Sequence, residues 1–262
     1  MEIKLDLPYL GLVPLSMQKE GLIYQSLLAK GSSLTSEAMR NLRTMIDFAG
    51  VFHKVKAMLL SSSVQGEGKT YVGSNLAVVF AQLGEKVLFI DGDLRRANVH
   101  KVFKVSSRNG LSDFLASGKD VADIPSLLQD SGVPNLKILP GGTRPPNPSE
   151  LLNTPRLGAL VAWATANFDR VIVDCTPMFP INDTLLWGRH VPAAVFVVRY
   201  GRTRIPLVRH ACRKLQAGGM SILGVAVNAA THRGLTYSTY GYYYYHQYYH
   251  SYHREGAADK PS

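Results

Sequence analysis

The sequence predicts an α/β fold: one mostly parallel, doubly wound sheet with helices on both faces. Between residues 57 and 228, short apolar runs that suit strands alternate with segments of helical period, as in successive parallel βαβ units. Residues 87–90 are apolar at every position, which is typical of a parallel strand buried on both faces. No internal repeat is evident. We therefore expect a single domain.

Composition limits the class of protein. The chain has 262 residues, 46% hydrophobic and 18% charged, enough for a sizeable core. Its longest apolar runs, such as 193–198, are far shorter than the roughly 20 residues of a membrane-spanning helix, and no signal peptide is evident. Two cysteines without metal-site spacing favour a reducing cytoplasm. The net charge of +10 fits an anionic partner or simply a solvated basic face.

Residues 61–70, SSSVQGEGKT, have the pattern of the phosphate loop of P-loop NTPases. Glycines let successive N–H groups point into one concavity, the lysine reaches the β- and γ-phosphates, and the threonine hydroxyl binds Mg²⁺. Ser63 replaces the first glycine of the motif, but an apolar run before the loop and a helical apolar stripe after it provide the required context. An ordinary glycine-rich turn is the alternative. The predicted nucleotide-binding residues are Gly66, Glu67, Gly68, Lys69, Thr70 and Tyr71.

Three acids follow predicted strands. Asp91 and Asp93 come after the run at 87–90, and Asp174 follows the apolar residues 171–173. In a doubly wound sheet, ligands bind beyond the carboxyl ends of the strands. Such acids are often only helix caps, but here they accompany a phosphate loop. Thr70, Asp93 and Asp174 are the predicted Mg²⁺-organising residues.

The remaining elements are predicted from the spacing of apolar residues and from the residues that typically begin or end helices and strands. Residues 9–15 are a short strand-like apolar run, and 135–139, 194–199 and 222–228 are further strands. Helices are expected at 36–48, 111–118, 149–168 and 205–217. On the first helix, Glu37, Arg40 and Arg43 recur at three-residue steps. They form either a solvated face with ion pairs or a self-association surface.

The end of the chain is unusual. Nine of the thirteen tyrosines lie between residues 237 and 252, interleaved with glycine, histidine and serine, without a period that would bury one face. A flexible tail is therefore expected. It could be an adhesive low-complexity segment, a segment that stacks on nucleic-acid bases or a histidine-assisted metal-binding segment. In a chain that also has an ATP site, its clustered phenol hydroxyls favour a phosphorylation substrate. The candidate phosphoacceptors are Tyr237, Tyr240, Tyr242, Tyr243, Tyr244, Tyr245, Tyr248, Tyr249 and Tyr252.

Together these motifs resemble the cytoplasmic kinase domain of the bacterial tyrosine autokinases of capsule and exopolysaccharide export. The resemblance covers roughly residues 10–252 and rests on VQGEGKT, LFIDGDLR, VIVDCTP, the Glu-x-x-Arg-x-x-Arg helix, RPPNPSELL and the tyrosine cluster. It implies a juxtamembrane-like extension at 1–30, a kinase domain at 31–235 and an acceptor tail at 236–262. Partition and division-site ATPases share the fold but carry a signature lysine that residues 61–64 lack.

The resemblance also implies function. It implies an ATP- and Mg²⁺-dependent protein-tyrosine autokinase with Lys69, Asp91, Asp93 and Asp174 as catalytic residues and Asp91 as the base. Glu37, Arg40 and Arg43 would build a ring, an octamer by resemblance, in which each tail enters a neighbour's site. The expected partners are a transmembrane activator, fused or separate, and a cognate phosphatase, and the expected location is the inner face of the plasma membrane. No nucleic-acid partner is expected. The alternative is an ATP-binding assembly scaffold with little transfer.

Overall fold

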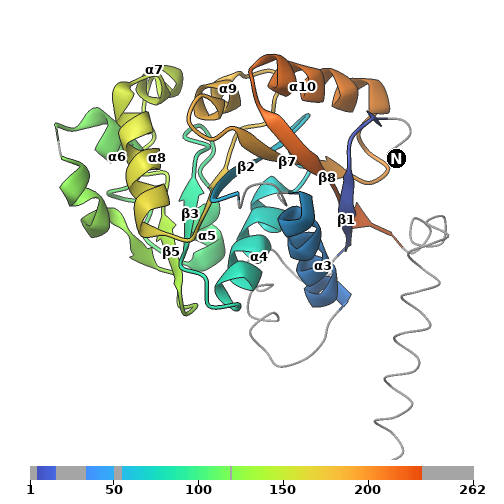
Figure 1. The fold of residues 1–262 in the computed structure, drawn as a ribbon. Coiled ribbons are helices and arrows are strands. Elements are labelled where there is room, and N and C mark those ends of the chain that lie inside the picture. Colours follow the sequence, from blue (N-terminus) through green and yellow to red (C-terminus); the bar gives the residue numbers. More distant parts are fainter. Residues whose placement is uncertain (1–4, 16–33, 50–54, 119, 232–262) are drawn as a thin grey trace, which may run out of the picture.

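The computed structural model describes residues 5–15, 34–49, 55–118 and 120–231. Its core is an eight-stranded sheet in the order β1-β8-β7-β2-β6-β3-β5-β4 (Figure 1). The strands are β1 (Tyr9–Pro14), β2 (Ala57–Ser62), β3 (Val87–Asp91), β4 (Gln129–Asp130), β5 (Leu136–Leu139), β6 (Arg170–Asp174), β7 (Ala193–Arg199) and β8 (Ser221–Ala230). All neighbours pair in parallel except β4 with β5. The predicted fold class is thereby confirmed.

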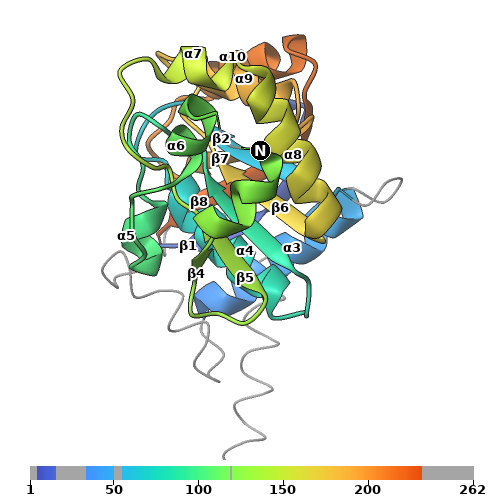
Figure 2. The same ribbon diagram turned by 90° about the vertical axis from the view of Figure 1, so that its left-hand side faces the viewer.

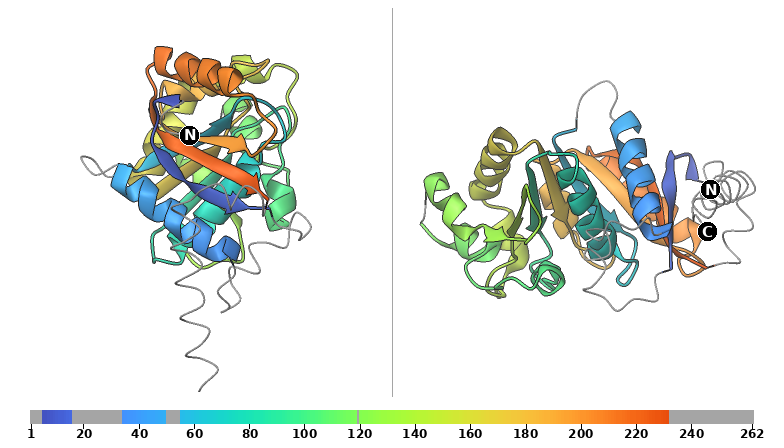
Figure 3. Two further views of the ribbon diagram at one scale, coloured as in Figure 1. Left: turned by 90° about the vertical axis from the view of Figure 1, so that its right-hand side faces the viewer. Right: turned by 90° about the horizontal axis from the view of Figure 1, so that it is seen from below.

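Helices cover both faces of the sheet. Side chains on β2 alternate between two apolar clusters: Met58 and Leu60 pack with α3 (Leu34–Ala49), α4 (Lys69–Ala81) and α5 (Val99–Phe103), whereas Leu59 packs on the opposite face. That face is covered by α6 (Leu111–Ala116), α7 (Pro148–Leu152), α8 (Pro155–Asn167), α9 (Asp183–Gly188) and α10 (Ile205–Ala217). Figure 2 shows the two helix layers from the β4 side, and the left view in Figure 3 shows α10 and α3 on opposite sides of the sheet.

The single helix predicted at 149–168 is wrong. The segment forms two helices, α7 and α8, separated by Asn153 and Thr154. Pro155 occupies the first turn of α8, and Thr154 before it is extended, with φ −86° and ψ 152°. A residue that precedes proline is pushed out of the helical region. The break between α7 and α8 therefore follows from the conformational restriction that Pro155 places on Thr154. The apolar periodicity of residues 149–168 alone does not show it.

Several short elements escape sequence patterns. These are α5, α9, β4 and the 3₁₀ helix η1 (Val121–Leu127), all of them seven residues or fewer. The strand-like run at 9–15 becomes β1, which pairs with β8 at the edge of the sheet, so the segment assigned to an N-terminal extension contributes a strand to the domain. The tail tyrosines at 237–252 lie outside the described residues. Among the described residues, every helix falls short of the length and hydropathy that spanning a membrane requires.

Candidate nucleotide site

A cavity of about 670 Å³ lies beyond the carboxyl ends of the central strands. This is the position at which doubly wound sheets bind ligands. The cavity contains the phosphate loop, the start of α4 and the segments that follow β3 and β6. Its walls include Gly66, Gly68, Lys69, Thr70, Tyr71, Asn75, Asp93, Arg95, Arg96, Lys101, Asp174, Thr176 and Phe179. Most of the predicted site residues therefore meet in one place.

The phosphate loop needs glycine at residue 68. Gly68 adopts φ 92° and precedes the first turn of α4, where its carbonyl accepts from the Val72 N–H at 2.9 Å. A Cβ at this position would lie 1.9 Å from Nδ2 of Asn228 on β8. Both the positive φ and this close approach exclude a side chain. The loop is therefore packed tightly against the end of a strand far away in sequence.

Lys69 and Thr70 begin α4 and point toward polar partners at the cavity. The Lys69 side chain is largely buried and its Nζ donates to Ser62 Oγ at 3.3 Å. The Thr70 hydroxyl donates to Oδ2 of Asp174 at 2.5 Å. A phosphate loop and an acid at a neighbouring strand end are thus joined directly, and two of the residues predicted to organise Mg²⁺ lie side by side.

Asp174 is buried at the end of β6, with the second oxygen of its carboxylate, Oδ1, lacking a hydrogen-bond partner among the described residues. Burial raises the pKa of Asp174 to about 6, although the nearby Lys69 ammonium and the Thr70 hydrogen bond oppose that rise. A buried carboxylate oxygen without a partner is costly. A cation held by oxygen ligands would satisfy it.

Asp93 supplies the second carboxylate of the cavity. It follows β3, and its Oδ1 accepts from the backbone N–H groups of Arg95 at 3.2 Å and Arg96 at 2.9 Å. Two carboxylates and the Thr70 hydroxyl are hard oxygen ligands of the kind Mg²⁺ prefers, completed in such sites by water and substrate phosphates. The residues present therefore fit Mg²⁺.

Asp91 has a different environment from Asp93. Its side chain is fully buried and is not among the cavity-lining residues. Oδ2 accepts from the Val99 N–H at 2.9 Å, while Oδ1 has no partner within the described ranges. Burial, and then the charge of Asp174, raise the pKa of Asp91 well above its ordinary value. The structure therefore does not bring this predicted base to the cavity surface.

Glu67 lies in the phosphate loop, but its side chain turns into the protein. It is fully buried, and its carboxylate accepts from the Val64 N–H at 2.8 Å and from the Thr203 hydroxyl at 2.5 Å. The Arg199 N–H adds a third contact at 3.3 Å, and Asn228 Nδ2 donates to the Glu67 carbonyl at 2.9 Å. Glu67 thus joins the loop to the ends of β7 and β8, contacts that no local pattern could reveal.

The three residues predicted for assembly lie on α3. Arg40 forms an ion pair with Glu37 on the same helix, whereas Arg43 Nη1 donates to the Val79 carbonyl of α4 at 3.2 Å. The first pair is a partly exposed intrahelical contact. The second joins α3 to the helix that begins at the phosphate loop. Both arginines of the motif are therefore engaged within their own chain, and Arg43 joins two helices.

Comparison with known proteins identifies the family. Residues 55–185 match the model of an AAA domain. The chain is 36% identical over 219 residues to the tyrosine-protein kinase Wzc of Salmonella typhi, covering 83% of this chain but 30% of that protein. It is 35% identical over 216 residues to the tyrosine-protein kinase YwqD of Bacillus subtilis (strain 168), covering 82% of this chain and 89% of that one.

A solved structure agrees with the sequence comparisons. The kinase domain of the Escherichia coli tyrosine kinase ETK superposes with a TM-score of 0.77 at 32% identity, over 88% of this chain and 94% of that one. The chain thus spans less than a third of the Wzc protein but nearly all of a kinase domain and of YwqD. On these matches, together with the nucleotide site, the chain belongs to the family of bacterial tyrosine-protein kinases.

Proposed function

We propose that this chain is an ATP-dependent protein-tyrosine kinase that phosphorylates tyrosines of its own C-terminal cluster. One observation carries the proposal: Lys69, Thr70, Asp93 and Asp174 line a single cavity in a chain that also carries nine clustered tyrosines. The relatives named as tyrosine-protein kinases support the same reaction. ATP is the phosphoryl donor, and a tail phenol is the acceptor.

The residues of the cavity divide the work of phosphoryl transfer, which depends mainly on positioning and electrostatic stabilisation. The loop N–H groups and Lys69 hold the β- and γ-phosphates. Thr70, Asp93 and Asp174 hold Mg²⁺, which neutralises charge on the phosphate oxygens when bound. Inside a cavity of the protein, each of these interactions is stronger than it would be in bulk water.

Proton removal is assigned to Asp91. A tyrosine hydroxyl has a pKa near 10, so a base must assist its attack. The raised pKa of Asp91 makes its carboxylate a stronger proton acceptor than an ordinary aspartate. Because this carboxyl is buried, the proposal requires the residues that cover it to move aside when the acceptor binds, while Asp93 keeps its contacts with Arg95 and Arg96.

Assembly and regulation complete the proposal. The tail of one copy enters the site of a neighbour in a ring, with Glu37, Arg40 and Arg43 at the contacts. Each phosphotyrosine adds roughly −1.5 to −2 charge, so phosphorylation opposes the net charge of +10 and weakens docking. The setting is control of exopolysaccharide export at the inner face of the plasma membrane, with a transmembrane activator and a phosphatase as partners.

Incubation with ATP and Mg²⁺ followed by phosphotyrosine detection tests the proposal. The intact chain should become phosphorylated, whereas Lys69→Met and a chain that ends at Thr236 should not. A fully active Lys69→Met variant would contradict the site assignment. Nucleotide binding without any phosphotyrosine would favour the alternative of an assembly scaffold. Light scattering before and after phosphatase treatment tests the ring, and an unchanged mass would count against its regulation by phosphorylation.

A further inference from the structure

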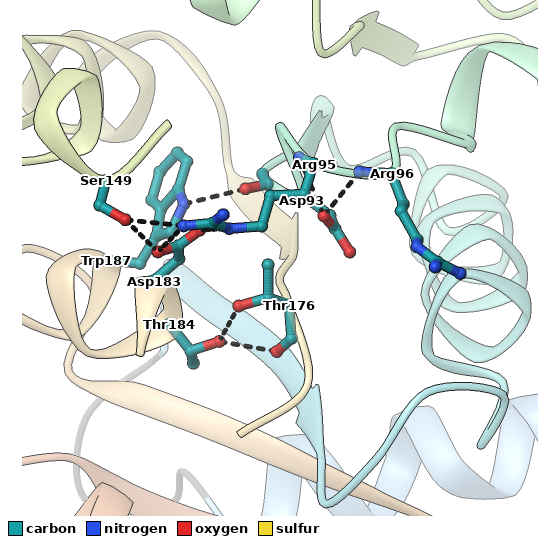
Figure 4. A network of polar contacts seen from close by, with 9 residues as sticks. Asp93, Arg95, Arg96, Ser149, Thr176, Asp183, Thr184 and Trp187 are labelled. Carbon is teal, nitrogen blue, oxygen red and sulfur yellow. Dashed lines mark hydrogen bonds and ion pairs between the residues drawn. The ribbon is translucent and has the colours of Figure 1, made fainter. Parts of the chain in front are cut away.

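Arg95 lines the cavity, but its guanidinium is bound by two residues from other parts of the chain. Its Nε donates to Oδ2 of Asp183 at 2.7 Å, its Nη2 donates to Oδ1 of the same carboxylate at 3.3 Å, and Nη2 also donates to Ser149 Oγ at 2.8 Å. The Ser149 hydroxyl in turn donates to Oδ1 of Asp183 at 2.8 Å. Figure 4 shows the three side chains converging from the segment after β3, from α7 and from α9.

The geometry of this contact is specific. Asp183 is 3% exposed and Arg95 34% exposed in their side chains, so the pair is shielded from solvent on one side. The guanidinium fork engages both oxygens of the carboxylate, an arrangement that fixes orientation as well as distance. Because Asp183 neutralises it, Arg95 is poorly suited to bind an anion in the cavity.

Arg96 provides a contrast with Arg95. It lines the same cavity and is exposed, and no hydrogen-bond or ion-pair partner of its guanidinium is found in the described part of the chain. In Figure 4 its side chain runs away from the Asp183 cluster. The two adjacent arginines therefore differ in role: Arg96 supplies a free charge, and Arg95 fixes the backbone.

The contacts of the Arg95 side chain hold the turn at Arg95 in place, and the orientation of the Asp93 carboxylate depends on that turn. The Asp93 carboxylate accepts from the N–H groups of Arg95 and Arg96, so its orientation depends on where that turn lies. Helix α9 also holds the residue before it, through a long contact of 3.4 Å from Trp187 Nε1 to the Gly92 carbonyl. A Cβ at Gly92 would lie 2.8 Å from Val173 Cγ1, so this segment packs directly on β6.

The same helix contacts the segment that carries the other carboxylate. The Thr184 hydroxyl donates to the Thr176 carbonyl at 2.7 Å, and Thr176 lies two residues after Asp174 on the cavity wall. Helix α9 therefore spans both carboxylate-bearing segments. Partners that orient metal ligands in this way typically change metal affinity when they are removed.

We propose that Asp183 and Ser149 are positioning residues that act through Arg95 to hold Asp93 in register with Asp174, and so set the affinity of the site for Mg²⁺. This inference rests on the proposed function, because it takes the cavity to be a magnesium–nucleotide site. It gives a role to Ser149, in the first turn of α7, and to α9. Sequence patterns had assigned a role to neither.

Binding of ADP to the full chain, measured by calorimetry across a Mg²⁺ titration and again in EDTA, tests this. Asp183→Asn should raise, by about tenfold or more, the Mg²⁺ concentration at which half of the Mg²⁺-dependent gain in ADP affinity is reached. It should leave the ADP affinity in EDTA unchanged. Ser149→Ala should shift this Mg²⁺ concentration in the same direction by less. The double variant should show less than the product of the two effects, because both act on one network.

Asp130→Asn is the matched control, since it removes a carboxylate from an exposed ion pair with Lys137 and should leave both affinities unchanged. A wild-type Mg²⁺ dependence in Asp183→Asn would overturn the proposal, as would an equal loss of affinity in EDTA, which would indicate general damage. Because ADP binding is the readout, a chain that binds ADP but transfers no phosphate still gives an answer.

Discussion

The Thr70 hydroxyl donates a hydrogen bond of 2.5 Å to Oδ2 of Asp174, across 104 positions of sequence. This contact joins the first turn of α4 to the end of β6 at the place where two carboxylates and a hydroxyl fit Mg²⁺. It means that the phosphate loop and the acidic strand ends are already assembled relative to each other.

Replacing Thr70 tests this junction. Thr70→Ala should lower ATP-dependent phosphotyrosine formation by about tenfold or more, because a hydrogen bond to a charged group contributes about 1.5–3 kcal/mol. Thr70→Ser keeps the hydroxyl and should retain most of the activity. Initial rates at saturating ATP and varied Mg²⁺ give the measurement. Equal rates for the alanine and serine variants would show that the hydroxyl is dispensable.

Glu67 offers a second test, because its side chain is buried among protein donors although the sequence places it among the nucleotide-binding residues. Its buried carboxylate accepts from Val64, Arg199 and Thr203, so Glu67→Gln should place amide hydrogens against donors. The free energy of unfolding should fall by about 1–3 kcal/mol, and nucleotide affinity should fall with it as the loop loosens. Urea denaturation without nucleotide and ADP titration provide the two measurements.

Thr203→Val is the control for Glu67, since it removes one donor and should cost about 1 kcal/mol. If Glu67→Gln weakens ADP binding with no loss of stability, the carboxylate contacts the nucleotide directly, which would agree with the prediction that Glu67 is a nucleotide-binding residue. The stability measurement therefore distinguishes a structural role of the Glu67 carboxylate from a direct contact with the nucleotide.

These residues show what the sequence can and cannot predict. The cavity positions of Thr70, Asp93 and Asp174 were predictable because each lies at, or two residues beyond, the end of an element with a strong local pattern. The contacts of Glu67 with Thr203 and of Arg95 with Asp183 join residues 136 and 88 positions apart, and no local period encodes them. The break between α7 and α8 was readable from Pro155, but the apolar stripe on both sides outweighed that signal.

The assembly helix can be examined in the isolated chain. Arg43 donates to the Val79 carbonyl of α4, so Arg43→Ala should lower the free energy of unfolding by about 1 kcal/mol under conditions where the chain is monomeric. Arg40 forms only a partly exposed pair with Glu37, and Arg40→Ala should cost no more than about 0.5 kcal/mol. Thermal unfolding at low concentration makes the comparison. Equal stability of both variants and the wild type would leave Arg43 with an intersubunit role alone.

Acid should weaken the start of α6 through Asp113. Partial burial raises its pKa, but hydrogen bonds from the Gly110 N–H at 2.8 Å and from Thr143 outweigh that effect, and the pKa lies below its ordinary value of 3.8. Between the folded and the unfolded pKa of Asp113, the unfolded state binds more protons than the folded state. The contribution of Asp113 to the free energy of unfolding is therefore present above pH 3.8 and is lost as pH falls through the folded pKa. Asp113→Ala should cost about 1 kcal/mol at pH 7 and progressively less below pH 4.

Urea denaturation of the wild type and of Asp113→Ala at several pH values measures this pH-dependent difference in stability. Asp113→Asn is the control, because it keeps an acceptor oxygen without a charge. Its stability relative to Asp113→Ala should not change across the same range, since neither side chain titrates. A difference between the wild type and Asp113→Ala that stayed constant from pH 7 down to pH 3 would show that the carboxylate charge does not stabilise the N-terminus of α6.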